Sequence, residues 1–130
     1  RKDGSWPNTD KLLENRFDST LQHPVYTDVS AKAGIMIEGH GLGVSIADIN
    51  QDGWKDIYIS NDYLSNNILY INNKNGTFTD QCATYLKHTS KNAMGNDIAD
   101  INNDGLADII ETDMMPADNY RQKMMHSDIS

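Results

Sequence analysis

The chain has few of the residues on which several common protein classes depend. Cys82 is its one cysteine in 130 residues, which excludes an internal disulfide and a cysteine-based zinc site. No apolar run approaches the roughly 18 residues of a membrane span. The first seven residues do not read as a signal peptide, so we expect either a removed targeting segment or a piece of a longer chain.

Basic residues are also few, with 11 Lys and Arg against 19 Asp and Glu and a formal net charge of −8. A nucleic-acid-binding surface needs a basic stripe that displaces counterions from phosphates. Nucleic acid is therefore not an expected partner. Two bound divalent cations would reduce the net charge to about −4, which points to the acidic residues as the feature to examine.

Arrangements typical of catalysis are missing as well. The four histidines have no metal-ligand spacing, and the Gly-rich stretch 38–43 lacks the lysine of a phosphate loop. No Ser/His/Asp arrangement stands out, and Asp is too abundant for a carboxylate pair to indicate a glycosidase. We predict no catalytic residues and no enzymatic activity for these residues.

Two nine-residue stretches, 48–56 and 100–108, share the pattern D-x-N-x-D-G-x-x-D. Side-chain oxygens at positions 1, 3, 5 and 9 of so short a loop can converge on one point, together with the carbonyl of position 7. Glycine at position 6 permits the sharp turn, and an all-oxygen set suits calcium. The sequence predicts two Ca²⁺ sites, with the ligands Asp48, Asn50, Asp52, Trp54 (carbonyl) and Asp56, and Asp100, Asn102, Asp104, Leu106 (carbonyl) and Asp108.

The two loops belong to a longer internal repeat. Asp48 and Asp100 are 52 residues apart, and the same offset aligns Gly43 with Gly95. Around the loops, each repeat contains four short strand-like segments, which in the more complete copy are 44–47, 57–60, 68–71 and 77–80. The apolar run 57–59 does not alternate with polar residues, as in a sheet covered on both faces. Asn75-Gly76 predicts a type I′ turn with positive φ at both residues.

Four-stranded sheets stacked around an axis form β-propellers of four to eight blades. We therefore predict an all-β fold of four-stranded antiparallel β-propeller blades, with about 2.5 repeats of 52 residues in an incomplete propeller. Residues 1–41 hold the end of a preceding blade plus loops, with strands at 12–15 and 25–30 and a surface loop at 17–24. Residues 42–93 form a complete blade with the first calcium loop. Residues 94–130 start a following blade with the second loop and a C-terminal loop or short helix near 117–125.

Other interpretations of the second loop and its surroundings remain open. Polar hairpin turns also favour Asp, Asn and Gly. The second loop fits the EF-hand signature with Glu111 at position 12, but the flanking runs are strand-like and the equivalent residue in the first loop is Ile59. We expect Glu111 at a sheet end or where a neighbouring blade is missing. The alternative is that it supplements the second metal site or reaches a ligand.

Residues 43–62 and 67–80 resemble an FG-GAP/VCBS repeat, the blade type of integrin α-chain propellers. The resemblance is greatest to the bacterial branch related to cartilage acidic protein. It implies that each loop joins the first two strands of a blade and that the ten residues named above hold calcium. It also implies an extracellular or cell-surface scaffold, with the remaining blades in the same longer chain or in other copies.

The resemblance implies adhesion or the binding of a protein or glycan ligand. Two alternatives stay open: a polysaccharide-acting enzyme with its active site outside these residues, and a self-assembling extracellular structural protein. Trp6, Trp54 and the six tyrosines could stack on sugars, although packing between blades is the alternative. Asn75-Gly-Thr77 is an N-glycosylation sequence, and Asp18-Ser-Thr20 resembles an O-glycosylation motif.

Overall fold

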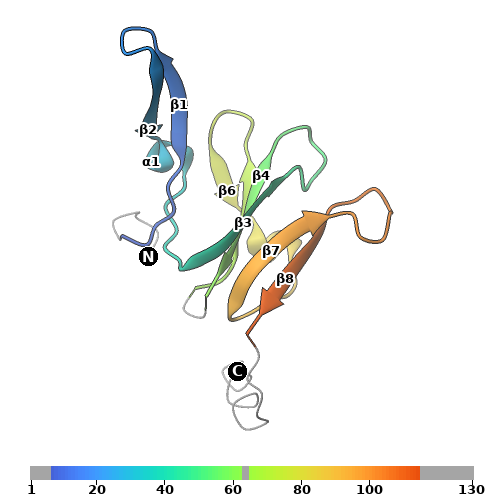
Figure 1. The fold of residues 1–130 in the computed structure, drawn as a ribbon. Coiled ribbons are helices and arrows are strands. Elements are labelled where there is room, and N and C mark those ends of the chain that lie inside the picture. The colour runs from blue at the N-terminus through green and yellow to red at the C-terminus, as the bar shows by residue number, and fades with distance from the viewer. Residues whose placement is uncertain (1–6, 63–64, 115–130) are drawn as a thin grey trace.

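Three antiparallel sheets follow one another along the chain in the computed structural model, which describes residues 7–62 and 65–114 (Figure 1). The first sheet is the hairpin of β1 (Leu13–Asp18) and β2 (His23–Asp28). The second has the order β3 (Gly41–Ala47), β4 (Asp56–Asn61), β5 (Ile68–Asn72) and β6 (Phe78–Asp80). The third pairs β7 (Ala93–Ala99) with β8 (Asp108–Asp113). The predicted all-β class with antiparallel sheets is thus confirmed.

The helical content of the described residues is small. Helices α1 (Ser30–Ala33) and α2 (Cys82–Tyr85) are single turns that follow β2 and β6. Within residues 7–62 and 65–114, no helix has the length and apolar character needed to cross a membrane. The helix predicted near 117–125 lies outside the described residues.

Strands β4 and β5 of the central sheet are buried on both faces, which explains their unbroken apolar runs, whereas Val44 and Ile46 of β3 are exposed. On one face, Ile59 of β4 packs with Ile68 and Tyr70 of β5, and with Ala33 and Ile35 from the segment before β3. Successive side chains of a strand point to opposite faces of the sheet, so the neighbouring residues of β4 and β5 form a second core cluster on the other face. It consists of Tyr58, Leu69, Ile71 and Cys82. Burying one such large side chain contributes about 1.5–3 kcal/mol.

The second and third sheets approach each other at a pair of repeated glycines. A Cβ atom on Gly43 of β3 would lie 2.9 Å from Cα of Gly95 and 3.0 Å from N of Asn96, both in β7. Only glycine lets two backbones pass this closely. The contact brings Ile98 and Ile109 of the third sheet onto the second core cluster.

The structure repeats itself at the offset seen in the sequence. Strands β7 and β8 and helix α2 each lie 52 residues after β3, β4 and α1. Val29 N donates to Leu12 O (2.9 Å), and Gln81 N, 52 residues later, donates to Leu69 O (2.8 Å). Leu12 and Leu69 are separated by five more residues than this period, so the β1–β2 hairpin contains the extra length.

Three local predictions need correction. The segment predicted as a surface loop at 17–24 is exposed, but only residues 19–22 form the turn, because Phe17 pairs with Pro24 and Asp18 with His23. The strand predicted at 25–30 ends at Asp28, whose carboxylate accepts hydrogen bonds from the N–H (2.9 Å) and the hydroxyl (2.6 Å) of Ser30 and so starts α1. The other correction concerns the turn between β5 and β6.

That turn does not have positive φ at Asn75 and Gly76 together, as a type I′ turn requires. Positive φ occurs at Lys74 (64°) and Gly76 (82°). Asn75 uses its side-chain oxygen to accept hydrogen bonds from the N–H (3.0 Å) and hydroxyl (2.7 Å) of Thr77. This Asx-type interaction competes with the primed turn, and it leaves Lys74 in the left-handed conformation.

Candidate functional site: two Asp-rich hairpin loops

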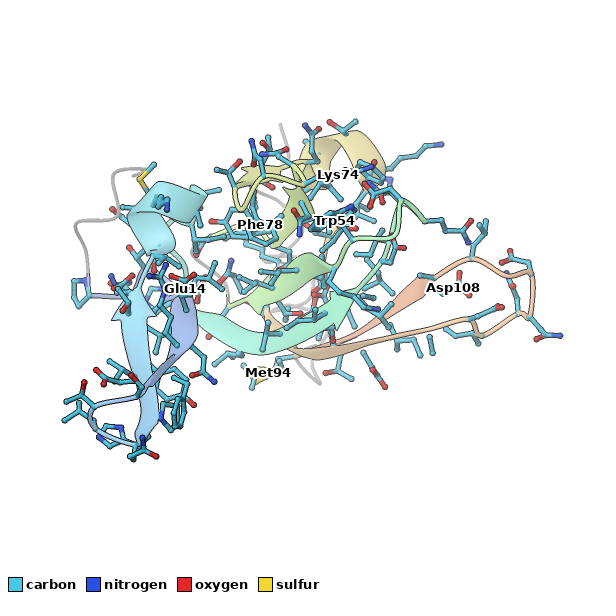
Figure 2. The ribbon with its side chains drawn as sticks, turned by 90° about the horizontal axis from the view of Figure 1, so that it is seen from above. Glu14, Trp54, Lys74, Phe78, Met94 and Asp108 are labelled. Carbon is cyan, nitrogen blue, oxygen red and sulfur yellow. The ribbon has the colours of Figure 1, made fainter. Side chains whose placement is uncertain are left out.

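The two Asp-rich stretches form the tips of equivalent hairpins. Residues 48–56 connect β3 to β4 and residues 100–108 connect β7 to β8, where Figure 2 labels Trp54 and Asp108. Gly53 and Gly105 have φ of 87° and 83°, and a Cβ on either would meet no atom within 4 Å. Glycine is therefore required at position 6 by the backbone conformation and not by crowding.

Oxygens of positions 1 and 3 converge in both loops. In the first loop, Asp52 N donates to Asp48 Oδ1 (2.9 Å) and to Asn50 Oδ1 (3.1 Å). In the second, Asp104 N donates to Asp100 Oδ1 (3.0 Å) and the equivalent Asn102 Oδ1 (2.9 Å). Because each pair of oxygens shares one donor, the first two predicted ligands of each site lie close together.

The carboxylate of position 5 is held in the same way. Asp52 Oδ1 accepts from Trp54 N (2.9 Å) and its Oδ2 from Asn50 Nδ2 (3.1 Å), and Asp104 has the equivalent bonds. Burial acts to raise the pKa of Asp52, but the hydrogen bonds from Trp54, Asn50 and Lys74 outweigh it and lower that pKa. Asp52 is therefore ionised at neutral pH, as a metal ligand must be.

Position 9 closes the base of each loop. Asp56 is fully buried, and its Oδ2 and Oδ1 accept from Ile49 N (3.0 Å) and Asn72 N (2.9 Å). Asp108 Oδ2 accepts from Ile101 N (3.0 Å). In this arrangement the last predicted ligand has a structural role in joining the two ends of the loop.

The donor set of each loop fits a hard cation by its chemistry, because every predicted ligand atom is an oxygen. Among residues 7–62 and 65–114, no group of three or more His, Cys, Asp or Glu side chains is gathered closely enough to hold a metal ion. Each predicted set, however, also includes an Asn side-chain oxygen and a main-chain carbonyl. Calcium binding by the ten residues stays a prediction.

The two loops are matched by one family model. The model of the FG-GAP-like repeat matches residues 48–111, which contain both loops, strands β4 to β7 and the start of β8. The chain belongs to the FG-GAP repeat family. The resemblance identified in the sequence is thus confirmed, while its assignment to a bacterial branch stays a prediction.

Relatives of this FG-GAP chain include two kinds of animal protein. Cartilage acidic protein 1 of Mus musculus is 36% identical over 84 residues, which are 64% of this chain and 13% of that protein. The protein of the same name from Homo sapiens is 34% identical over 84 residues, with the same shares. Integrin alpha-3 of Mus musculus is 32% identical over 80 residues, 53% of this chain and 8% of that protein. The chain thus spans about a tenth of the length of these relatives.

The two FG-GAP loops differ in their surroundings. The side chains of positions 1, 3 and 5 are half-buried in the first loop and exposed in the second. Asn72 on the β5–β6 turn contacts the first loop through its own N–H and side chain. The loops also contact each other, since Gln51 Nε2 donates to Gly105 O (2.6 Å).

Glu111 joins the two FG-GAP sheets through a polar cluster. Its Oε1 accepts from the hydroxyls of Tyr58 (3.2 Å) and Ser60 (2.8 Å). Asn67 Nδ2 donates to both carboxylate oxygens (2.8 and 2.9 Å), and the Ser90 hydroxyl donates to Oε2. Burial and the nearby Glu111 carboxylate raise the pKa of the Tyr58 phenol.

The expectation for Glu111 was therefore wrong. It lies neither at a sheet end nor beside a missing neighbour, because its partners come from β4, from the segment before β5 and from the segment before β7. Sequence reasoning identified Glu111 as a departure from the repeat, where Ile59 is the equivalent residue. It missed the partners, which are hydroxyl and amide groups without a recognisable spacing.

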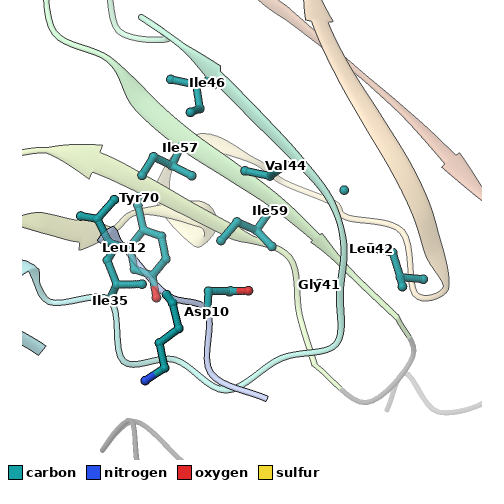
Figure 3. A pocket seen from close by; sticks show the side chains of 12 residues that line it. Asp10, Leu12, Ile35, Gly41, Leu42, Val44, Ile46, Ile57, Ile59 and Tyr70 are labelled. Carbon is teal, nitrogen blue, oxygen red and sulfur yellow. The ribbon is translucent and has the colours of Figure 1, made fainter. Parts of the chain in front are cut away.

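An apolar cavity of about 380 Å³ lies on the opposite face of the central sheet (Figure 3). Its lining includes Val44 and Ile46 of β3, whose side chains are 65% and 64% exposed. These residues are the repeat equivalents of Asn96 and Ile98, and Ile98 packs on the preceding sheet. At the rim, burial raises the pKa of Asp10, and burial also raises the pKa of Tyr70 to about 12.

Proposed function

We propose that this FG-GAP chain is a calcium-binding segment of an extracellular or cell-surface scaffold that takes part in adhesion or presents a binding surface to a protein or glycan ligand. The observation that carries the proposal is the internal order of the two loops. Six equivalent hydrogen bonds hold each loop in one conformation. In that conformation, oxygens of positions 1 and 3 converge on one side of a short turn.

Calcium would supply positive charge to balance the three carboxylates of each loop. Three carboxylates within one nine-residue loop repel one another, and a divalent cation offsets that repulsion. Extracellular sites typically bind calcium with a Kd of roughly 0.1–1 mM. At about 1 mM calcium, a site with a Kd near 0.1 mM would add roughly 1.4 kcal/mol to the free energy of unfolding.

We further propose that the sheets are blades of a β-propeller. Two features support this arrangement. Consecutive repeats pack sheet against sheet where Gly43 meets Gly95, and the exposed face at Val44 and Ile46 is the equivalent of a face that is covered in the next repeat. The additional blades would come from the same polypeptide or from other copies.

The extracellular setting and the non-enzymatic role rest on the relatives. One is an integrin α chain and the other is named for cartilage, and both names fit a scaffold outside the cell. Among the described residues, no observation favours the alternative of a polysaccharide-acting enzyme. We therefore propose binding, and not catalysis, as the function of this segment.

Isothermal titration calorimetry of the chelator-treated chain with CaCl₂ tests the proposal. We expect two sites in the chain, one site in each of D48N and D100N, and none in the double variant. Magnesium at the same concentrations is the control, because its smaller ion demands near-ideal octahedral geometry. Absence of binding heat, together with a melting temperature that EDTA does not change, would overturn the proposal.

A further inference from the structure

The first loop carries a cation of its own. Lys74 Nζ lies 3.3 Å from Asp52 Oδ2, the carboxylate of position 5. The Asp52 side chain is 19% exposed and that of Lys74 is 50% exposed. The ammonium thus forms an ion pair with a predicted ligand carboxylate.

The backbone brings Lys74 to this place. Lys74 has a φ of 64°, a conformation that costs free energy in a residue with a Cβ. Its N–H donates to Asn72 Oδ1 (2.9 Å), while Asn72 Nδ2 donates to Lys55 O (3.1 Å) in the loop. Asn72 N donates to Asp56 Oδ1 (2.9 Å). The end of β5 and the turn after it are therefore fastened to the first loop, and the backbone of Lys74 is held beside that loop. Figure 2 labels Lys74 and Trp54 in this region.

The second loop has the same three carboxylates without this compensation. In the part of the chain that the structure describes, no Lys, Arg or His pairs with Asp100, Asp104 or Asp108. The internal hydrogen bonds of the two loops are otherwise equivalent, so the ammonium of Lys74 is a charge that the first loop has and the second lacks.

We propose that Lys74 is a tethered counter-cation of the first loop, which stabilises that loop without metal and lowers its affinity for a divalent cation below that of the second loop. This inference rests on the proposed calcium function. A divalent ion at the first loop must displace the ammonium from Asp52 or bind close to it, and like charges at such distances repel. A partly exposed ion pair changes an equilibrium by about two- to fivefold.

Trp54 offers a way to observe the first loop alone. It occupies position 7, where the second loop has Leu106, and a nearby Trp sensitises the luminescence of Tb³⁺, a calcium-sized probe. Excitation at the red edge of tryptophan absorption then reports filling of the first loop. The W54L variant gives the background from Trp6, and the W54L/L106W variant moves the reporter to the second loop.

Titration with Tb³⁺ in K74Q tests the inference. We expect its half-saturation concentration at the first loop to fall about two- to fivefold, with no change at the second loop in W54L/L106W/K74Q. K32Q is the matched control, because Lys32 is an exposed lysine of α1 away from the loops. Titrating CaCl₂ against bound Tb³⁺ should reproduce the same order.

A measurement without metal gives a second readout. In EDTA, K74Q should melt below the parent chain because Asp52 loses its partner, whereas K74R should melt near it. Binding of Tb³⁺ and Ca²⁺ with equal half-saturation in K74Q and the parent chain would overturn the inference and leave the calcium proposal standing. No binding of either ion in any variant would overturn the calcium proposal itself.

Discussion

The two Asp-rich loops share one sequence pattern and one backbone conformation but lie in two different environments. Both follow D-x-N-x-D-G-x-x-D, both join two antiparallel strands, and both have positive φ at positions 4 and 6. The first is fastened by the β5–β6 turn and has a fully buried Asp56. The second is exposed from position 1 to position 7.

The nine loop residues and their neighbours determine different properties of each loop. Equivalent hydrogen bonds in unlike surroundings mean that the nine residues themselves specify the conformation of the loop. Burial, charge compensation and resistance to opening come from residues outside it, above all Asn72 and Lys74. Four measurements test whether the loop residues and their neighbours have these separate roles.

The largest difference is expected at position 9. In D56A, the N–H groups of Ile49 and Asn72 lose a shared buried acceptor, and each unsatisfied buried donor costs about 1–3 kcal/mol. We expect a loss of about 3 kcal/mol for D56A and about 1 kcal/mol for D108A, where the structure shows one such bond. Urea unfolding followed by circular dichroism measures both. Equal losses would contradict a role for the surroundings.

Substitutions of Glu111 test the contact between the second sheet and the third sheet. Replacing Glu111 by Ile copies the equivalent residue of the first repeat, Ile59, but leaves Ser60, Asn67 and Ser90 without their acceptor. We expect E111I to lose about 2 kcal/mol of unfolding free energy, and E111Q, which keeps one acceptor oxygen, about 1 kcal/mol. An E111I variant as stable as the parent in thermal melts would show that the cluster contributes nothing.

Hydrogen exchange compares the two loops without mutation. The N–H groups of Asp52 and Gly53 have the same acceptors as those of Asp104 and Gly105. The first loop is fastened to the β5–β6 hairpin and the second is exposed. We therefore expect the amides of the first loop to exchange about tenfold more slowly in EDTA than those of the second loop. Mass spectrometry of peptides that span each loop provides the rates, and equal protection would refute the expectation.

The smallest effect concerns Asp28 and its repeat equivalent Asp80. Hydrogen bonds from the hydroxyl and N–H of Ser30 lower the pKa of Asp28 below 3.8, helped by the Lys11 ammonium against the opposing effect of burial. Its carboxylate therefore adds stability above the unfolded-state pKa, and this contribution disappears as the pH falls through the folded pKa. The repeat equivalent of Ser30 is Cys82, which uses only its N–H toward Asp80.

Replacing Ser30 by Ala isolates the hydroxyl. We expect S30A to raise the pKa of Asp28 toward 3.8 and to reduce the loss of stability on acidification. Carboxyl-detected NMR titration follows the Asp28 resonance directly. A pKa of Asp28 that S30A leaves unchanged would assign the shift to the backbone N–H of residue 30 and to Lys11 instead of the hydroxyl.

Sequence patterns predicted the parts of the fold that depend on local signals. Strands β3, β4, β7 and β8 were found because β-branched runs and glycines recur at one period. The extended hairpin at 17–24 was missed because Asp18, Ser19 and Pro24 favour turns and loops over strands. Its pairing comes from continuing the β1–β2 ladder, and the one-turn helices depend on side-chain hydrogen bonds such as that of Asp28 to Ser30.

The candidate site was likewise predictable only in the parts that depend on local sequence. The loop residues, their spacing and the need for glycine were all readable from the nine-residue pattern. Neither Lys74 beside Asp52 nor Asn72 beside Asp56 could be predicted. Lys74 lies in a turn whose backbone conformation was itself predicted wrongly, and Asn72, the last residue of β5, reaches Asp56 through a contact between distant segments that the loop pattern does not contain. Glu111 was recognised as unusual, but its partners required knowing which sheet packs against which.

The extra five residues of the β1–β2 hairpin have a consequence for how such a chain can change over evolutionary time. They lengthen the hairpin beyond the bond between Leu12 and Val29, whose counterpart joins Leu69 and Gln81 in the next repeat. From Val29 onward, the chain keeps the 52-residue offset of the repeat. Insertions and deletions at the end of the β1–β2 hairpin therefore leave the Asp-rich loops in place, so this hairpin is free to diverge in length while the strands that carry the loops stay under constraint.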